Sequence, residues 1–342
     1  MYQKYIKHPI THGENYRQLR NQVNNLIRQS KAKYYQNLLK SQVNDNKNTW
    51  KTLNHLMNRN SKASNQFKIK KEDGNFTEDS NDIAEIFNQY FLSAPRNIAN
   101  NLPPPTKNFQ DYLSGSFPEL SNFRYVTPDD ICKLIEELKT TGGSGYLEIP
   151  TKVLKCIMHA IATRLANIFN RCLSEGFFPE SLKIAQVVPV YKAGDSFKPC
   201  NYRPISVLTC ISKILEKIVY SQVSKHLDIN NILNGHQYGF RKGVSTDIAI
   251  GKLMEKITLC RNNNEIGLCV FLDLQKAFDL VDTRILLNKL SHYGINGPPL
   301  RLIQSFLENR SQFVRINTSS SSTERVSLGT PQGSILSPML FT

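Results

Sequence analysis

The sequence predicts a helix-rich α+β fold preceded by a mainly helical, basic N-terminal region. Apolar residues recur at helical spacing over long stretches, while the short β-rich runs do not alternate regularly with helices as they do in a doubly wound sheet. The positive charge is concentrated at one end. Residues 1–71 carry 15 Lys and Arg against two acidic residues, whereas the whole chain has a net charge of +15.

Length and composition exclude several classes of protein. With 342 residues, 40% of them hydrophobic, the chain can build one to three domains. It has no apolar run long enough to span a membrane and no signal or transit pattern, so we expect a soluble intracellular protein, nuclear or cytoplasmic. The seven cysteines form no C-x-x-C pair, which argues against a disulfide framework and a zinc ribbon.

Residues 1–121 are predicted to form a helical basic arm and a linker. Apolar residues recur every three or four positions from Glu14 to Arg59, which predicts basic amphipathic helices. A turn at residues 71–75 precedes a predicted helix over 79–92, and the prolines from Pro103 open a polar stretch to about Ser121. The excess of cations indicates a polyanion such as nucleic acid, and a solvated basic helix is the alternative.

Residues 122–342 are predicted to form the folded body. Thr127 and Pro128 provide an N-cap and a first-turn proline for one helix, and Gly176 closes another over 151–175. The β-rich run 185–191 contains a proline that favours an edge strand. Further helices are predicted at 211–228, 245–260, 280–292 and 298–308, and strands at 267–273, 312–317 and 324–328, the last two paired as a hairpin across residues 319–322.

Asp273 is the first candidate for chemistry. It ends the apolar run Leu268–Leu272, which predicts a largely buried strand. A buried carboxylate requires a basic partner or a hard divalent cation. A turn residue or an ordinary salt bridge is the alternative.

The segment Phe271-Leu-Asp273-Leu-Gln-Lys-Ala-Phe278-Asp279 resembles motif A of reverse transcriptases. The resemblance implies that Asp273 is catalytic and binds two Mg²⁺ ions with help from the carbonyl group of Leu274. It also implies that Phe278 lies against the nucleotide as a steric gate, although a core position is compatible with that role. Asp279 and Asp282 are better interpreted as caps of the following helix.

Residues 188–207, which contain V-P-V-Y-K and N-Y-R-P-I-S, resemble the fingers blocks of the same family. The resemblance assigns Lys192 and Arg203 to the incoming triphosphate. Cations suit this role because a triphosphate that leaves as pyrophosphate carries negative charge, and Arg offers a planar fork to phosphate oxygens. Two ordinary surface cations are the alternative.

Residues 237–246 resemble the block that lies along the template strand, here called the template block. The resemblance assigns five of its residues to template binding: Gln237, Phe240, Arg241, Lys242 and Ser245. Contacts from Arg241 and Lys242 to the strand's backbone would position it without reading bases. Ser245 also suits the N-cap of the predicted helix that follows it.

Residues 329–338, G-T-P-Q-G-S-I-L-S-P, resemble motif B and are called the motif B segment here. In the family its Gln and Gly, here Gln332 and Gly333, line the nucleotide pocket. Glycine permits close backbone approach, and Gln332 can hydrogen-bond to template or nucleotide.

The ordered blocks over residues 126–342 are most similar to polymerases of jockey-type non-LTR retrotransposons. The expectation is a reverse transcriptase domain at 122–342 with right-hand polymerase fingers and a partial palm, and an arm similar to the connector between endonuclease and polymerase. The implied partners are an RNA template, a DNA primer and dNTP, with Mg²⁺ as cofactor. The implied reaction is template-directed dNTP addition by two-metal catalysis.

Two departures from the family pattern qualify this expectation. The loop before Ile149 reads G-S-G-Y-L-E instead of a P-G-P-D-G pattern. The Tyr/Phe-x-Asp-Asp motif that supplies further metal carboxylates does not occur after the motif B segment. We therefore expect a fragment that is inactive alone. A non-catalytic nucleic-acid-binding fragment or a decayed element copy is the alternative.

Overall fold

The computed structural model describes residues 2–7, 9–42, 45–57, 67–71, 73–140, 143, 145–147 and 149–342. It combines helices and strands and divides into two compact units, residues 1–66 and 67–342. Residues 67–121, which the sequence analysis groups with the arm and linker, lie in the same unit as residues 122–342.

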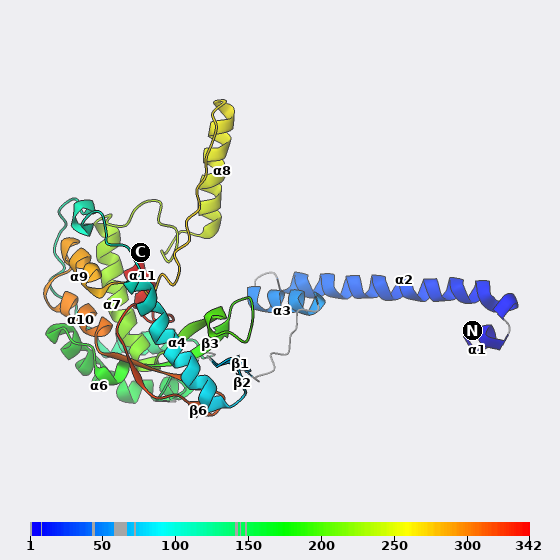
Figure 1. Ribbon diagram of the computed structural model, residues 1–342, viewed down its shortest axis with the longest axis horizontal. Coiled ribbons are helices and arrows are strands. Elements are labelled where there is room, and N and C mark those ends of the chain that lie inside the picture. The colour runs from blue at the N-terminus through cyan, green and yellow to red at the C-terminus, as the bar shows by residue number, and fades with distance from the viewer. Residues whose placement is uncertain are drawn as a thin grey trace. The chain divides into compact units, whose positions relative to one another are not determined.

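The first unit is helical, as the periodicity predicts. It contains α1 (Tyr2–Lys7), α2 (Pro9–Ser41) and α3 (Asn46–Leu56), and α2 is a single long helix (Figure 1). Asp45 caps α3 by accepting the backbone N–H of Asn48 at 3.1 Å. The Thr49 hydroxyl donates to the Gln42 carbonyl at 2.9 Å, which joins α3 to the end of α2.

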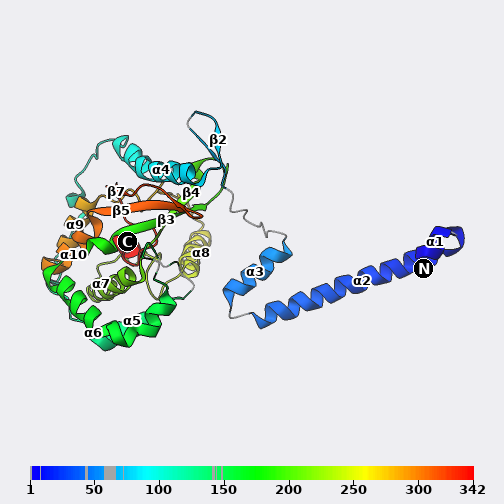
Figure 2. The ribbon, with the colours of Figure 1, turned by 90° about the horizontal axis from the view of Figure 1, so that it is seen from below.

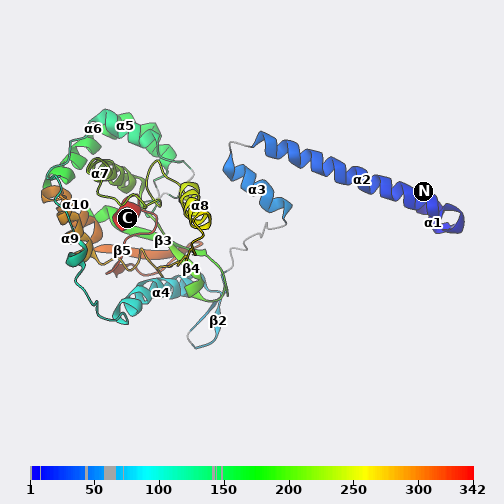
Figure 3. The same cartoon turned by 90° about the horizontal axis from the view of Figure 1, so that it is seen from above.

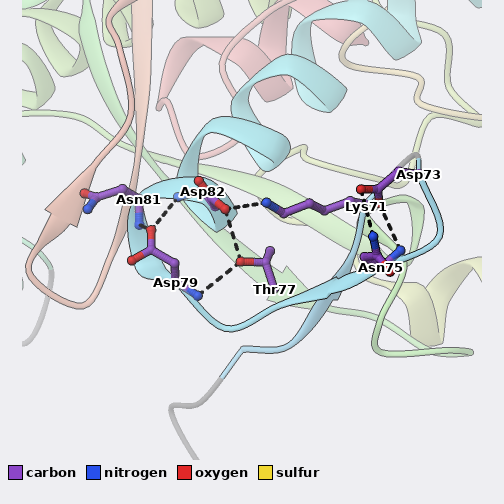
Figure 4. Close-up of polar contacts among 7 residues, drawn as sticks. All are labelled: Lys71, Asp73, Asn75, Thr77, Asp79, Asn81 and Asp82. Atoms are coloured by element: carbon purple, nitrogen blue, oxygen red, sulfur yellow. Dashed lines mark hydrogen bonds and ion pairs between the residues drawn. The ribbon is translucent and has the colours of Figure 1, made fainter.

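A small hairpin opens the second unit and leads into α4 (Ser80–Asn100). Strands β1 (Ile69–Lys70) and β2 (Phe76–Thr77) are antiparallel. Asp79 caps α4 through the N–H groups of Asn81 and Asp82, and Lys71 forms an ion pair with Asp82 at 2.5 Å (Figure 4). These contacts fix the hairpin to the first turn of the helix.

The central sheet has five strands: β3 (Ile184–Tyr191), β4 (Tyr202–Val207), β5 (Arg310–Ile316), β6 (Ser319–Ser320) and β7 (Glu324–Val326). The order is β4-β3-β5-β6, and β7 also pairs with β5. The β5–β7 pairing is antiparallel, which confirms the predicted hairpin. The edge prediction for residues 185–191 holds only in part, because β3 pairs with β5 over Ile184–Val187 and with β4 alone beyond it, where Pro189 lies.

Helices cover both faces of this sheet. In Figures 2 and 3, α4 lies on one face, and α5 (Pro128–Glu136), α6 (Thr151–Glu175) and α7 (Cys210–Ile229) lie on the other. On the first face, buried side chains of α4 and of the strands form one apolar cluster: Ile83, Phe87, Phe91, Val187, Tyr202, Val314 and Ile316. The bulky rings of α4 therefore bind the segment that follows β2 to the sheet.

The larger core lies among the helices, which include α9 (Thr283–His292) and α10 (Gly297–Leu307). The end signals read from the sequence are confirmed: Thr127 forms a capping box with Asp130, and Gly176 ends α6 with φ of 77°. Three 3₁₀ turns complete the unit: η1 (Phe109–Tyr112), η2 (Glu180–Leu182) and η3 (Pro199–Asn201).

The predicted strand at residues 267–273 is wrong. This stretch is irregular, and Leu268, Phe271 and Leu272 are 88%, 83% and 88% exposed. A strand requires a neighbour to accept its backbone hydrogen bonds, and none of the described strands pairs with this stretch. The preceding helix α8 (Thr246–Asn262) has no buried residue and extends away from the sheet (Figure 1). Within the described ranges, no helix is long and apolar enough to cross a membrane.

Candidate functional site

Lys192 and Arg203 lie on the β3–β4 hairpin. Val190 pairs with Arg203, and the Lys192 N–H donates to the Asn201 carbonyl at 2.8 Å. Because side chains alternate along a strand, this register places Lys192 and Arg203 on the same face of the hairpin. Both are exposed, and in the part of the chain that the structure describes neither forms an ion pair. Their cationic groups are thus available to an anion.

Backbone hydrogen bonds join the motif A turn to the motif B segment. The Gly329 N–H donates to the Val281 carbonyl at 3.1 Å, and the Thr330 N–H donates to the Phe278 carbonyl at 2.9 Å. Gly329 has φ of 75°, and a Cβ atom there would lie 2.5 Å from the Asp279 carbonyl oxygen. Only glycine permits this approach, so the two predicted motifs are adjacent in the fold.

Gly333 performs a similar role against β4. The Ser206 N–H donates to the Gln332 carbonyl at 2.7 Å, and a Cβ atom on Gly333 would lie 2.4 Å from the Ser206 carbonyl oxygen. With φ of 126°, Gly333 also has a backbone conformation that disfavours other residues. The motif B segment therefore lies directly against the strand that carries Arg203.

The Phe278 ring of motif A contacts the template block and α11 (Leu336–Phe341). It packs edge-on against Phe240 of the template block, with centroids 5.6 Å apart, and lies tilted against Phe341 of α11 at 4.9 Å. Phe240 has φ of 58° and remains 57% exposed. Phe278 is thus part of an aromatic cluster that is open to solvent on the Phe240 side.

The Gln332 side chain contacts motif A. Its Nε2 donates to Asp279 Oδ1 at 2.8 Å. Burial raises the pKa of the Asp279 carboxyl above its ordinary value, and the hydrogen bond from Gln332 opposes this increase. Asp279 therefore does not cap α9, whereas Asp282 does, through the N–H groups of Arg284 and Ile285.

Most polar residues of the template block have local roles. Gln237 Nε2 donates to the Gly239 carbonyl at 3.0 Å, and Arg241 forms an ion pair with Asp228 at 3.7 Å. Ser245 is the N-cap of α8, as the sequence indicates. Lys242 is exposed. Among the side chains of this block, those of Lys242 and Phe240 are exposed and suited to contact a nucleic acid.

Asp273 and Leu274 lie in the exposed irregular stretch that follows α8. Over the described ranges, no three His, Cys, Asp or Glu side chains are grouped closely enough to hold a metal ion. Asp279 accepts a hydrogen bond from Gln332. The described residues by themselves do not fit a two-magnesium site.

Glu216 of α7 is a structural centre that the sequence analysis did not identify. It is completely buried, and its carboxylate accepts from the hydroxyl of Ser334 at 2.6 Å and from the N–H groups of Ile335 and Leu336 at 2.7 and 3.3 Å. Ser212 donates to its other oxygen at 3.1 Å. The sequence signal was a lone acidic residue in the apolar run of the predicted 211–228 helix.

Comparisons with known proteins show which family the sequence resembles. Residues 190–342 match the family model described as reverse transcriptase (RNA-dependent DNA polymerase). The chain is 30% identical over 241 residues to the probable RNA-directed DNA polymerase from transposon BS of Drosophila melanogaster, covering 69% of this chain and 26% of the relative. It is 28% identical over 265 residues to the RNA-directed DNA polymerase from mobile element jockey of the same species, covering 77% and 28%. The chain thus spans about a quarter of the length of these relatives.

Proposed function

The chain belongs to the reverse transcriptase family of non-LTR retrotransposons through residues 190–342, and from this premise we propose that it contributes to template-directed DNA synthesis on RNA. The observation that carries the proposal is the contact between blocks far apart in sequence. The motif A turn, the motif B segment and β4 are joined by backbone hydrogen bonds and by two glycines that no other residue could replace without a clash. The β3–β4 hairpin would belong to the fingers and the motif A turn to the palm.

We assign the incoming dNTP to the surface beside the β3–β4 hairpin. Lys192 and Arg203 would bind its phosphates, since both are exposed cations on one face of the hairpin. Phe278, Gln332 and Gly333 would shape the pocket for the sugar and base. Gln332 would act through its orientation, which the hydrogen bond to Asp279 fixes.

We assign the RNA template to the template block. Phe240 offers an exposed ring for stacking, and Lys242 offers a charge to phosphate. Gln237, Arg241 and Ser245 would act indirectly, because their side chains hold the loop and the start of α8. The DNA primer would approach the same side.

Asp273 would supply a carboxylate, and Leu274 a carbonyl group, to the Mg²⁺ site of the full enzyme. Bound Mg²⁺ ions would supply charge stabilisation to phosphoryl transfer. Because the described residues do not fit such a site on their own, we propose that residues 1–342 alone do not polymerise.

Primer extension tests this proposal. The 342-residue chain and its Asp273→Ala variant are assayed on an RNA template with a DNA primer, dNTP and Mg²⁺ or Mn²⁺. We expect no template-dependent product from either protein. A product that the Asp273→Ala variant lacks would contradict the proposed inactivity while supporting the assignment of Asp273.

Charge favours a second candidate function, non-catalytic binding of nucleic acid. Residues 1–71 hold 15 Lys and Arg and two acidic residues. This candidate is tested in a protein lengthened at its C-terminus to the size of the relatives. Tight RNA binding without primer extension by that protein would favour the binding function over the enzyme.

A further inference from the structure

Arg310 is the first residue of β5, and its side chain is buried. It is 6% exposed, and every second residue after it on β5 is buried as well: Gln312, Val314 and Ile316. Arg310 therefore lies on the buried, α4-facing side of the strand. Neither Nε nor Nη1 has a hydrogen-bond partner among the residues that the structure describes. A buried guanidinium in this state is costly, so its presence requires a reason.

Arg310 lines two small cavities, of about 40 and 10 Å³. Asp279, Gln332 and Thr330 also line the larger one. The Thr330 hydroxyl, on a residue that is 2% exposed, also lacks a partner among the described residues. An ordered water requires about 10–15 Å³ and two or more polar partners. The larger cavity has the space and the polar groups to connect Arg310 to Asp279 through water.

Two carboxylates act electrostatically on Arg310, namely Asp279 and Glu216. Burial raises the pKa of both carboxyls and lowers the pKa of Arg310 to about 10. Each group is therefore costly to ionise alone. A guanidinium that lines the same cavity as the Asp279 carboxylate offsets part of that cost for both groups.

We propose that Arg310 is a positioning residue whose charge keeps Asp279 ionised inside the protein. Asp279 and Glu216 hold the two ends of one segment. Asp279 accepts from the side chain of Gln332, and Glu216 accepts from the backbone of Ile335. Arg310 thus orients the Gln332 end of this segment through Asp279. The effect of Arg310 on a bound nucleotide rests on the proposed function, whereas its effect on the hydrogen bonds of Asp279 does not.

Double substitution separates charge compensation from packing. The 342-residue protein is compared with Arg310→Met, Asp279→Asn and the double variant, with Arg325→Met as a control, because Arg325 is an exposed arginine on β7. Hydrogen exchange is measured over residues 329–338 at pH 7. We expect Arg310→Met to accelerate exchange there at least tenfold. The added Asp279→Asn should restore part of the protection, because it removes a carboxylate that has lost its counter-ion.

The pH dependence gives a second readout. The acceleration in Arg310→Met should be smaller at pH 5 than at pH 8, because the buried carboxylates take up protons as the pH falls. Among the described residues, Lys276 also acts electrostatically on Asp279 and Lys183 lines the smaller cavity, and burial lowers the pKa of both lysines.

An equal acceleration at both pH values, or no recovery in the double variant, would overturn the proposal. If Arg310→Met does not fold, the measurement becomes whether the double variant folds. A double variant that also fails to fold would overturn the proposal. No nucleotide or polymerisation enters these measurements. A negative result here would therefore leave the proposed function intact. Failure of the proposed function would likewise leave this proposal intact.

Discussion

Replacing Glu216 by alanine should remove the hydrogen bonds that join the motif B segment to α7. The variant would leave the Ser334 hydroxyl and the Ile335 N–H without their buried acceptor, and Ser212 would lose a partner as well. An unpaired buried donor costs about 1–3 kcal/mol, and loss of one partner in a buried charged network costs about 3–5 kcal/mol. These terms overlap, so we expect a total loss of about 4 kcal/mol in the free energy of unfolding.

Glu216→Gln provides the matched comparison. Its amide oxygen can still accept from Ser334 and Ile335, and the Ser212 hydroxyl can rotate to accept from the new amide. We expect this variant to lose about 1 kcal/mol. The measurement is urea unfolding followed by far-UV circular dichroism at pH 7. Glu136→Ala, on the exposed side of α5, should stay within about 0.5 kcal/mol of the parent chain. A loss below about 1 kcal/mol for Glu216→Ala, or equal losses for the two Glu216 variants, would refute the reasoning.

Three further predictions follow from pKa, sterics and charge. Because folding raises the Glu216 pKa, the parent chain should lose stability as pH rises through the folded pKa. Glu216→Gln lacks this group, so its deficit in urea unfolding should shrink from pH 5 to pH 8, and a constant deficit would contradict the shift. Gly333→Ala should lose about 3 kcal/mol of unfolding free energy in the same assay, because its Cβ would clash with the Ser206 carbonyl. Gly251→Ala is the control: Gly251 lies within α8 with no atom near the position of a Cβ, so this variant should gain about 0.5–1 kcal/mol. Equal effects of the two substitutions would refute the steric argument. Deleting residues 1–66 removes 12 Lys and Arg and should flatten the salt dependence of RNA affinity measured by fluorescence anisotropy; an unchanged slope would exclude the arm as a phosphate contact.

The helices were predictable because their signals are local. The Thr127 capping box, the Gly176 C-cap and the apolar periodicity of residues 151–175 depend on neighbours within a few positions. The β5–β7 hairpin was predictable for the same reason, because its two strands are separated by a short turn.

The strand at 267–273 was not predictable in the same way, because apolar character does not supply a pairing partner. The run Leu268–Leu272 has the composition of a buried strand, yet it is exposed where no described strand lies beside it. Propensity describes how well residues fit a sheet, and it does not create the sheet.

The site was predictable as motifs but not as contacts. Gln332 and Asp279 each lie in a recognisable block, yet neither block specifies that their side chains meet. Glu216 and Arg310 lie outside the residues assigned a role and act over sequence separations of about one hundred positions, since Glu216 bonds to residues 118–120 positions away. Local patterns carry no information about such pairs. For Glu216 the available signal was a charged residue within the apolar pattern of the predicted 211–228 helix, whereas Arg310 lies before the predicted strand at 312–317.

The exposed stretch after α8 has a consequence for the protein in concentrated solution. Residues 268–272, L-C-V-F-L, are rich in β-forming side chains, carry no charge and contain no proline or glycine. Such a run has the length and composition of an aggregation-prone segment. Beside it, α8 presents Ile250, Met254 and Ile257 to solvent. We expect the purified chain to aggregate through this stretch, and a lysine in place of Val270 should delay the onset of light scattering.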